Sequence, residues 1–207
     1  MAGQKEVITK DLERYQLARL EGFKQENERF KKGGIVFAGD SIVEFFPLKK
    51  YLGREKQLIN RGISGTDSNW LLAHLDEQIL ALDPEKIFLL IGTNDLGLGY
   101  SVSEVSNRIG QLIGQIRNNS LTVHIYLLSV LPVNEDNRYA DKVKIRSNQL
   151  IKSLNDNLKV LPGAEFIDLF PHLVDEEGNL AASFTTDGLH LTPDGYAKLA
   201  ELLHWDL

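Results

Sequence analysis

The sequence predicts one three-layer α/β/α domain, spanning residues 1–207, built around a five-stranded parallel sheet. Three observations lead to this prediction. Short apolar segments alternate along the chain with longer amphipathic ones, as in folds with a parallel sheet. The apolar segments are hydrophobic at consecutive positions, which is typical of strands covered on both faces. A chain of 207 residues suits one compact core, and it contains no repeat or linker-like stretch.

The apolar segments are the predicted strands, and they are rich in Ile, Leu, Val and Phe. In chain order they are residues 34–39, 58–63, 86–92, 123–130 and 165–169.

The segments around the strands carry apolar residues at helical spacing. Ser101 with Glu104 forms a capping-box pattern, and Thr192 before Pro193 places an N-cap ahead of a proline at the first helical position. Asp83-Pro84 ends the third of these segments. The predicted helices are residues 6–31, 41–51, 69–82, 101–118, 138–160 and 192–203.

Composition narrows the possible functions. The formal net charge of −6 argues against a nucleic-acid surface, which needs clustered Lys and Arg. Cysteine is absent, which excludes disulfides, zinc–thiolate sites and a cysteine nucleophile. No apolar run opens the chain and no stretch approaches the roughly 20 apolar residues of a membrane span. We therefore expect a cytoplasmic protein with no metal and no membrane span.

Polar and glycine residues follow the predicted strands. In a parallel α/β sheet, ligands bind beyond the carboxyl ends of the strands, so these residues are expected to converge. The motifs are Gly39-Asp40-Ser41, residues 60–67, Gly92-Thr93-Asn94-Asp95 and the loop Thr186-Asp187-Gly188-Leu189-His190-Leu191.

Ser41 is the candidate nucleophile. At a strand-to-helix turn its hydroxyl faces the crevice, and its backbone N–H is an unpaired donor of the first helical turn. The alternative is that Ser41 is only a helix N-cap partnered by Asp40. We interpret Asp40 itself as structural.

Gly65 and Asn94 are candidate oxyanion donors. Gly65 offers a backbone N–H with no side chain to block a substrate, and Asn94 offers a neutral amide at a strand end. For each, the alternative is an ordinary turn residue. Asp95 is interpreted as a structural turn or cap residue.

Asp187 and His190 are the candidate acid and base. Their three-residue spacing on one loop lets the carboxylate fix the imidazole tautomer while the other ring nitrogen takes a proton from Ser41. The alternative is a capping Asp and a surface His. The remaining histidines fit plainer roles on helices, a strand and a loop; they are His74, His124, His172 and His204.

Together these motifs resemble the four sequence blocks of the SGNH, or GDSL-like, hydrolases. The similarity is greatest to the catalytic subunits of intracellular platelet-activating-factor acetylhydrolase, in the run 37–43, in His190-Leu191-Thr192 before Gly195-Tyr196, and in a helix ahead of the first strand. The resemblance implies a flavodoxin-like sheet of order 2-1-3-4-5, no cofactor and a homodimer. It also implies a serine ester hydrolase with a catalytic Ser41–His190–Asp187 triad and an oxyanion hole formed by the N–H groups of Ser41 and Gly65 with the amide of Asn94.

The substrate is less determined by the sequence. The acetylhydrolase subunits usually have Asn at the position of Asp95, whereas bacterial thioesterase and lysophospholipase relatives have Asp, as this chain does. This difference leaves the acetyl-phospholipid substrate open. An apolar crevice rim is expected to bind a short or medium acyl group. The alternatives are a carbohydrate O-acetylesterase and a non-catalytic, flavodoxin-like module for a small ligand. The predicted rim residues are Phe45, Leu98, Tyr100, Val133 and Phe184.

Overall fold

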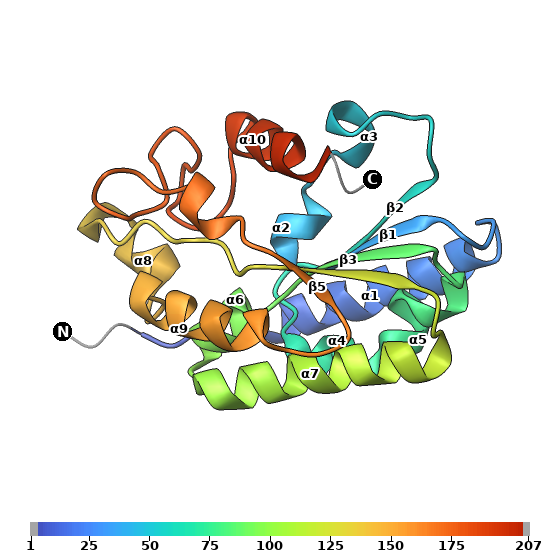
Figure 1. The fold of residues 1–207 in the computed structure, drawn as a ribbon. Helices are drawn as coiled ribbons and strands as arrows, with labels where there is room; N and C mark the ends of the chain where they lie inside the picture. Colours follow the sequence, from blue (N-terminus) through green and yellow to red (C-terminus); the bar gives the residue numbers. More distant parts are fainter. Residues whose placement is uncertain (1–3, 205–207) are drawn as a thin grey trace.

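A five-stranded parallel sheet forms the centre of the computed structural model, which describes residues 4–204 (Figure 1). The strand order is β2-β1-β3-β4-β5, and every neighbouring pair is parallel. This confirms the predicted fold class and order. The strands are β1 (Ile35–Gly39), β2 (Leu58–Gly62), β3 (Lys86–Leu90), β4 (His124–Leu128) and β5 (Glu165–Ile167).

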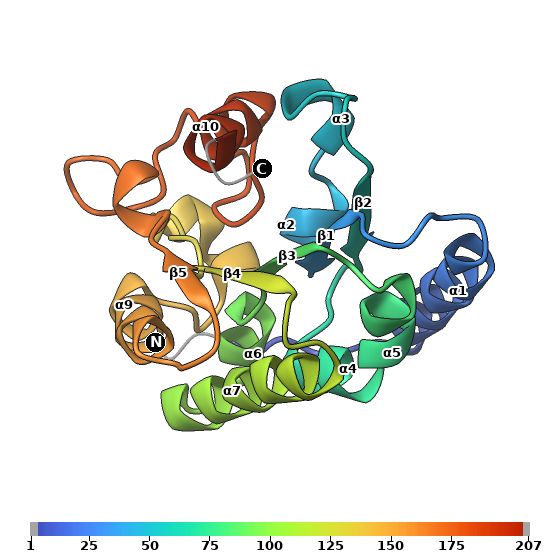
Figure 2. The same ribbon diagram turned by 45° about the vertical axis from the view of Figure 1, so that its right-hand side comes forward.

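Helices cover both faces of the sheet (Figures 1 and 2). One face carries α4 (Ser68–Ala73), α5 (Leu75–Gln78), α7 (Val102–Asn119) and α9 (Asn148–Lys159). The other carries α2 (Ser41–Glu44), α3 (Leu48–Tyr51) and α10 (Pro193–Leu203). The long α1 (Lys10–Asn27) packs against α5 beyond the β2 edge. The remaining short helices are α6 (Thr93–Leu98), α8 (Ala140–Val143), η1 (Leu80–Leu82), η2 (Asn137–Tyr139) and η3 (Phe170–His172).

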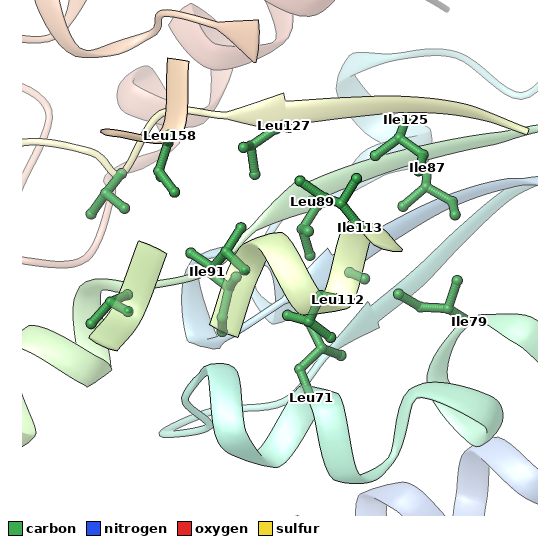
Figure 3. Close-up of a cluster of buried hydrophobic side chains, with 14 of the residues drawn as sticks. Leu71, Ile79, Ile87, Leu89, Ile91, Leu112, Ile113, Ile125, Leu127 and Leu158 are labelled. Carbon is green, nitrogen blue, oxygen red and sulfur yellow. The ribbon is translucent and has the colours of Figure 1, made fainter. Parts of the chain in front are cut away.

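Successive residues of a strand pack into two separate cores, one on each face of the sheet. Ile87 and Leu89 of β3 point to the side of α4 and α7, where they pack with aliphatic residues such as Leu112 and Ile125 (Figure 3). Phe88, between them in sequence, lies in the core on the α10 side. Both sides are buried, which explains why the strands are apolar at consecutive positions.

The predicted helix starts at Ser101 and Thr192 are confirmed. Ser101 caps α7 and forms a full capping box with Glu104, and the Thr192 hydroxyl accepts the Gly195 N–H at the start of α10. No helix within residues 4–204 is long and apolar enough to cross a membrane.

Four predicted helices differ from the structure. The first begins only at Lys10, after the N-cap Thr9. The segment 41–51 divides into α2 and α3 at Pro47, which has no N–H to continue a helix. The segment 138–160 divides where Lys144 adopts φ 57°, a left-handed conformation that ends α8. The segment 69–82 divides into α4, α5 and η1, with His74 between the first two.

Candidate active site

The four sequence motifs meet at the carboxyl ends of the strands. Ser41 begins α2 directly after β1, Gly65 follows β2, and Asn94 lies in the first turn of α6 after β3. His190 comes from the loop before α10. These four residues line one pocket of about 260 Å³, so the residues predicted from separate strand ends share one site.

Ser41 occupies the first turn of α2 and is not its N-cap. The N-cap is Asp40, whose Oδ1 accepts the Ile42 N–H at 2.9 Å, so the alternative interpretation of Ser41 as a cap is wrong. The Ser41 hydroxyl instead lies 2.9 Å from Nε2 of His190. The Ser41 N–H has no partner within its own helix, because first-turn donors have no preceding carbonyl to bind.

Asp187 holds His190 in one orientation. Its Oδ2 lies 2.7 Å from His190 Nδ1, while its Oδ1 accepts the backbone N–H groups of Leu189 and His190 at 3.0 and 2.7 Å. Burial opposes ionisation of Asp187, but the hydrogen bonds from His190 and Leu189 outweigh it and lower the pKa. The carboxylate therefore favours a proton on Nδ1, which leaves Nε2 free to accept the proton of Ser41.

Thr185 fixes the loop that carries this pair. Its hydroxyl donates to the His190 carbonyl at 2.8 Å and accepts the Gly188 N–H at 2.9 Å. Gly188 has φ 83°, and a Cβ there would lie 2.6 Å from Tyr139. The tight turn that presents the imidazole therefore requires glycine at this position.

The amide of Asn94 can face the pocket in only one way. Its Nδ2 donates to the Thr66 carbonyl at 3.0 Å, and its Oδ1 accepts from Arg146 Nη2 at 3.1 Å. A carbonyl can only accept and a guanidinium can only donate, so the amide cannot flip. One Nδ2 proton is used by Thr66 and Asn94 lines the pocket, so the second proton can donate to a group bound there.

The backbone conformation of Gly65 explains why glycine occupies this position. A Cβ on Gly65 would meet Leu12 of α1 at 2.7 Å, and its φ is 75°. Glycine therefore fits the left-handed turn and the contact with α1, and Leu12 lines the pocket together with Gly65.

Asp95 lies behind the pocket and not in it. It is fully buried, receives the Ser68 N–H at the start of α4, and contacts the Ser68 hydroxyl and Arg108. Burial raises the pKa of Asp95 to about 6. The position at which the chain departs from the acetylhydrolase pattern therefore contacts scaffold groups, as the structural interpretation expected.

Only one of the five predicted rim residues lines the pocket. Phe45 is 51% exposed, and its ring centroid lies 5.7 Å from that of His190. The prediction for Val133 is wrong, because Val133 is completely buried in the core. Three others lie outside the pocket: Tyr100 packs under Arg108, Phe184 packs on the α10-side core, and Leu98 ends α6.

Other pocket residues were missed by the sequence analysis. Ser64 and Leu189 adjoin predicted site residues and could have been found from that proximity. The rest come from the N-terminal segment and α8, which carry no local signal; they are Glu6, Ile8, Leu12 and Lys142. Among residues 4–204, no cluster of three or more metal-ligating side chains is present.

A larger hollow of about 520 Å³ lies between α1, α3 and β2, away from Ser41. Arg61 lines it, buried between the rings of Phe23 and Phe30 and paired with Glu26 at 2.9 Å. Asn60, from the second motif, also borders this hollow. It donates to the Val43 carbonyl at 2.6 Å and thereby ties α2 to β2. We assign no catalytic group to this hollow.

Asp40 makes stability depend on pH. Burial raises its pKa to about 7 despite the Ile42 N–H bond, so the native carboxyl keeps its proton above the ordinary pKa of 3.8. The stabilisation of the folded state by protonated Asp40 is fully present below pH 3.8 and is lost as the pH rises through about 7. Asp40→Asn retains an N-cap acceptor without the charge.

We therefore expect Asp40→Asn to become more stable relative to the native sequence as the pH rises over this range, by roughly 2–4 kcal/mol. Urea denaturation of both proteins at several pH values measures the difference. A difference that does not change with pH would contradict the burial argument.

Comparison with known proteins identifies the family. The model of the GDSL-like lipase/acylhydrolase family matches residues 37–198. A solved structure from Streptococcus pneumonia, described provisionally as a platelet activating factor, superposes with a TM-score of 0.89 at 38% identity, covering 93% of this chain and 92% of that one. The platelet-activating factor acetylhydrolase IB subunit alpha2 of Gallus gallus is 25% identical over 84% of this chain and 76% of its own length.

A further relative is named as a transferase and not as a hydrolase. The N-acylneuraminate cytidylyltransferase of Escherichia coli O18:K1:H7 is 29% identical over 84% of this chain. The match spans only 40% of that protein's length.

The fold and these matches define an ester hydrolase. More specifically, the chain belongs to the GDSL-like lipase/acylhydrolase family. The alternative of a non-catalytic ligand-binding module is therefore not retained.

Proposed function

We propose that this enzyme hydrolyses esters with a short acyl group through an acyl-enzyme on Ser41. One observation carries the proposal: a continuous chain of hydrogen bonds joins Ser41 Oγ, His190 and Asp187 at the edge of the pocket, with links of 2.9 and 2.7 Å. A nucleophile, its base and the group that orients the base are thus within reach of one another.

Acylation follows from this arrangement. Ser41 Oγ attacks the ester carbonyl as His190 Nε2 removes its proton, and the carbonyl electron pair moves to oxygen. The oxyanion is stabilised by the N–H groups of Ser41 and Gly65 and by Asn94 Nδ2. His190 then donates the proton to the departing alkoxide as the carbonyl re-forms.

Deacylation repeats these steps with water. His190 takes a proton from water, the hydroxide adds to the acyl carbon, and the bond to Ser41 Oγ breaks as the serine regains a proton. The carboxylate of Asp187 stabilises the imidazolium in both halves.

The pocket lining indicates the substrate class. Its volume of about 260 Å³ lies below the range typical of drug-sized ligands, which favours a short acyl chain. Apolar side chains of Ile8, Leu12 and Phe45 share the pocket with polar groups of Glu6 and Lys142. An apolar acyl group and a polar alcohol both find matching surface here.

The polar groups support a carbohydrate O-acetyl ester as a second candidate substrate. The similarity to a protein that is named for an N-acylated sugar favours a sugar as the alcohol part of the ester, whereas the acetylhydrolase similarity favours an acetyl-phospholipid. The homodimer that the resemblance implies stays a prediction.

Substrate choice is tested with p-nitrophenyl esters. We expect kcat/KM to be highest for acetyl and butyryl esters and lowest for decanoyl, because a long chain cannot be enclosed. Acetylated sugars and an acetyl-phospholipid, assayed alongside, separate the two candidate substrates. Activity that rises steadily toward decanoyl would contradict the short-acyl proposal.

A further inference from the structure

A buried arginine connects the N-terminal segment to the proposed oxyanion hole. The side chain of Arg146 is completely buried between α8 and α9. Its Nε donates to the Thr93 carbonyl at 2.8 Å, and its Nη2 donates to Asn94 Oδ1 at 3.1 Å. The planar guanidinium therefore grips two consecutive residues in the first turn of α6, a geometry that a lysine ammonium cannot reproduce.

The contact with Asn94 has a chemical consequence. Arg146 fixes the carbonyl end of the amide, so the amide N–H points away from the guanidinium. A positive charge on Oδ1 also polarises the amide and makes its N–H a stronger hydrogen-bond donor. Both effects would act on the group that faces the oxyanion.

The charge of Arg146 is balanced by the N-terminal segment. Glu6 Oε2 lies 3.2 Å from both Nη1 and Nη2 of Arg146, and Glu6 Oε1 lies 3.2 Å from Lys144 Nζ. Burial acts to raise the pKa of Glu6, but Lys144 and Arg146 together lower it, so the carboxylate is ionised at neutral pH. A buried guanidinium without this partner would be strongly destabilised.

Two backbone features fit this arrangement. The Glu6 N–H donates to the Gly97 carbonyl at 2.7 Å, which fastens the segment to α6. A Cβ at Gly97 would lie 2.2 Å from Arg146 Nη2, so α6 leaves room for the guanidinium only because residue 97 is glycine. Glu6 lies outside residues 37–198, the part matched by the family model.

We propose that Arg146 is a positioning residue for the oxyanion hole, acting through Asn94, and that Glu6 holds Arg146 in place. The N-terminal segment then helps to position the oxyanion hole and does not only pack over the site. This inference rests on the proposed function, because it requires Asn94 to face an oxyanion.

A double-mutant cycle on the full-length enzyme tests the inference. Arg146→Lys and Glu6→Ala are each made in the native sequence and in Asn94→Ala, and kcat is measured with p-nitrophenyl acetate. In the native sequence we expect Arg146→Lys to lower kcat about tenfold and Glu6→Ala several-fold. In Asn94→Ala, which itself loses about 10²–10³ in kcat, neither change should lower kcat by more than about twofold, because their route to the oxyanion is gone.

The control is Glu13→Ala, which removes the same charge from an exposed position in the first turn of α1; it should leave kcat unchanged. Thermal unfolding identifies a variant that fails to fold. If Arg146→Lys does not fold, the cycle with Glu6→Ala alone tests the inference, because the Glu6 side chain is 29% exposed.

Two outcomes overturn the inference. One is losses of equal size in both backgrounds, which indicate a general structural effect; the other is native activity of Glu6→Ala. A fluorophosphonate probe separates these from failure of the proposed function. If the probe labels Ser41 and each substitution lowers kcat by the same factor in both backgrounds, only the positioning role is wrong. If Ser41 is not labelled, the proposed nucleophile itself is wrong.

Discussion

Replacing Ser41 by Ala is expected to reduce ester turnover by about 10⁵-fold or more and to leave the fold intact. The loss is large because the Ser41 hydroxyl is bonded to His190 Nε2, whereas the hydroxyl of Ser64, which also lines the pocket, is bonded to Glu44. The effect on stability is small, because the hydrogen bond that is lost joins the hydroxyl to the partly exposed imidazole of His190, and alanine is favourable within a helix.

A fluorophosphonate probe and a matched control make this test specific. The probe should label Ser41 in the native enzyme and nothing in Ser41→Ala. Ser103→Ala removes a hydroxyl from an exposed residue in the first turn of another helix, α7, and should keep full activity and full labelling. Labelling that persists in Ser41→Ala would move the nucleophile to a different serine.

The fold, and the convergence of the candidate site residues, could be predicted from the sequence because both depend on local patterns. Consecutive apolar residues mark strands buried on both faces, and the polar residue just beyond each strand lies at the carboxyl edge of a parallel sheet. Ser41 and Asn94 were found in this way, since each follows its strand within four residues.

The apolar mouth could not be predicted in the same way. Val133 follows β4 just as Asn94 follows β3, yet it points into the core. The reason is a distant side chain: Asn148 of α9 binds both the N–H and the carbonyl of Val133, at 2.9 and 2.8 Å. An apolar residue after a strand therefore gives the same pattern whether it faces a crevice or a core.

The N-terminal contribution was missed for a related reason. Glu6 meets Arg146 across 140 positions of sequence, and neither residue lies in a recognisable motif. Ile8 and Leu12 fit the apolar spacing of a helix that only packs on the domain. Their place in the pocket depends on how α1 lies over Gly65, which is a matter of tertiary packing.

Removing the base should have the second large effect. His190→Ala is expected to bring activity near background at neutral pH, because Ser41 then keeps its proton and acylation nearly stops. Asn94→Ala should instead retain measurable activity, because two backbone donors of the proposed oxyanion hole remain. The pH profile of Asn94→Ala should match that of the native enzyme, since its base is unchanged, whereas His190→Ala should recover only slightly at high pH.

His172→Ala is the matched control for His190→Ala. His172 is exposed at the end of η3 and does not line the pocket, so its loss should not change kcat/KM. Initial rates on p-nitrophenyl acetate across a range of pH give all three comparisons. Normal activity in His190→Ala would end the triad proposal, because no other histidine lines the pocket within residues 4–204. Full activity in Asn94→Ala on several esters would make Asn94 a turn residue, and the contact with Arg146 would then serve the scaffold alone.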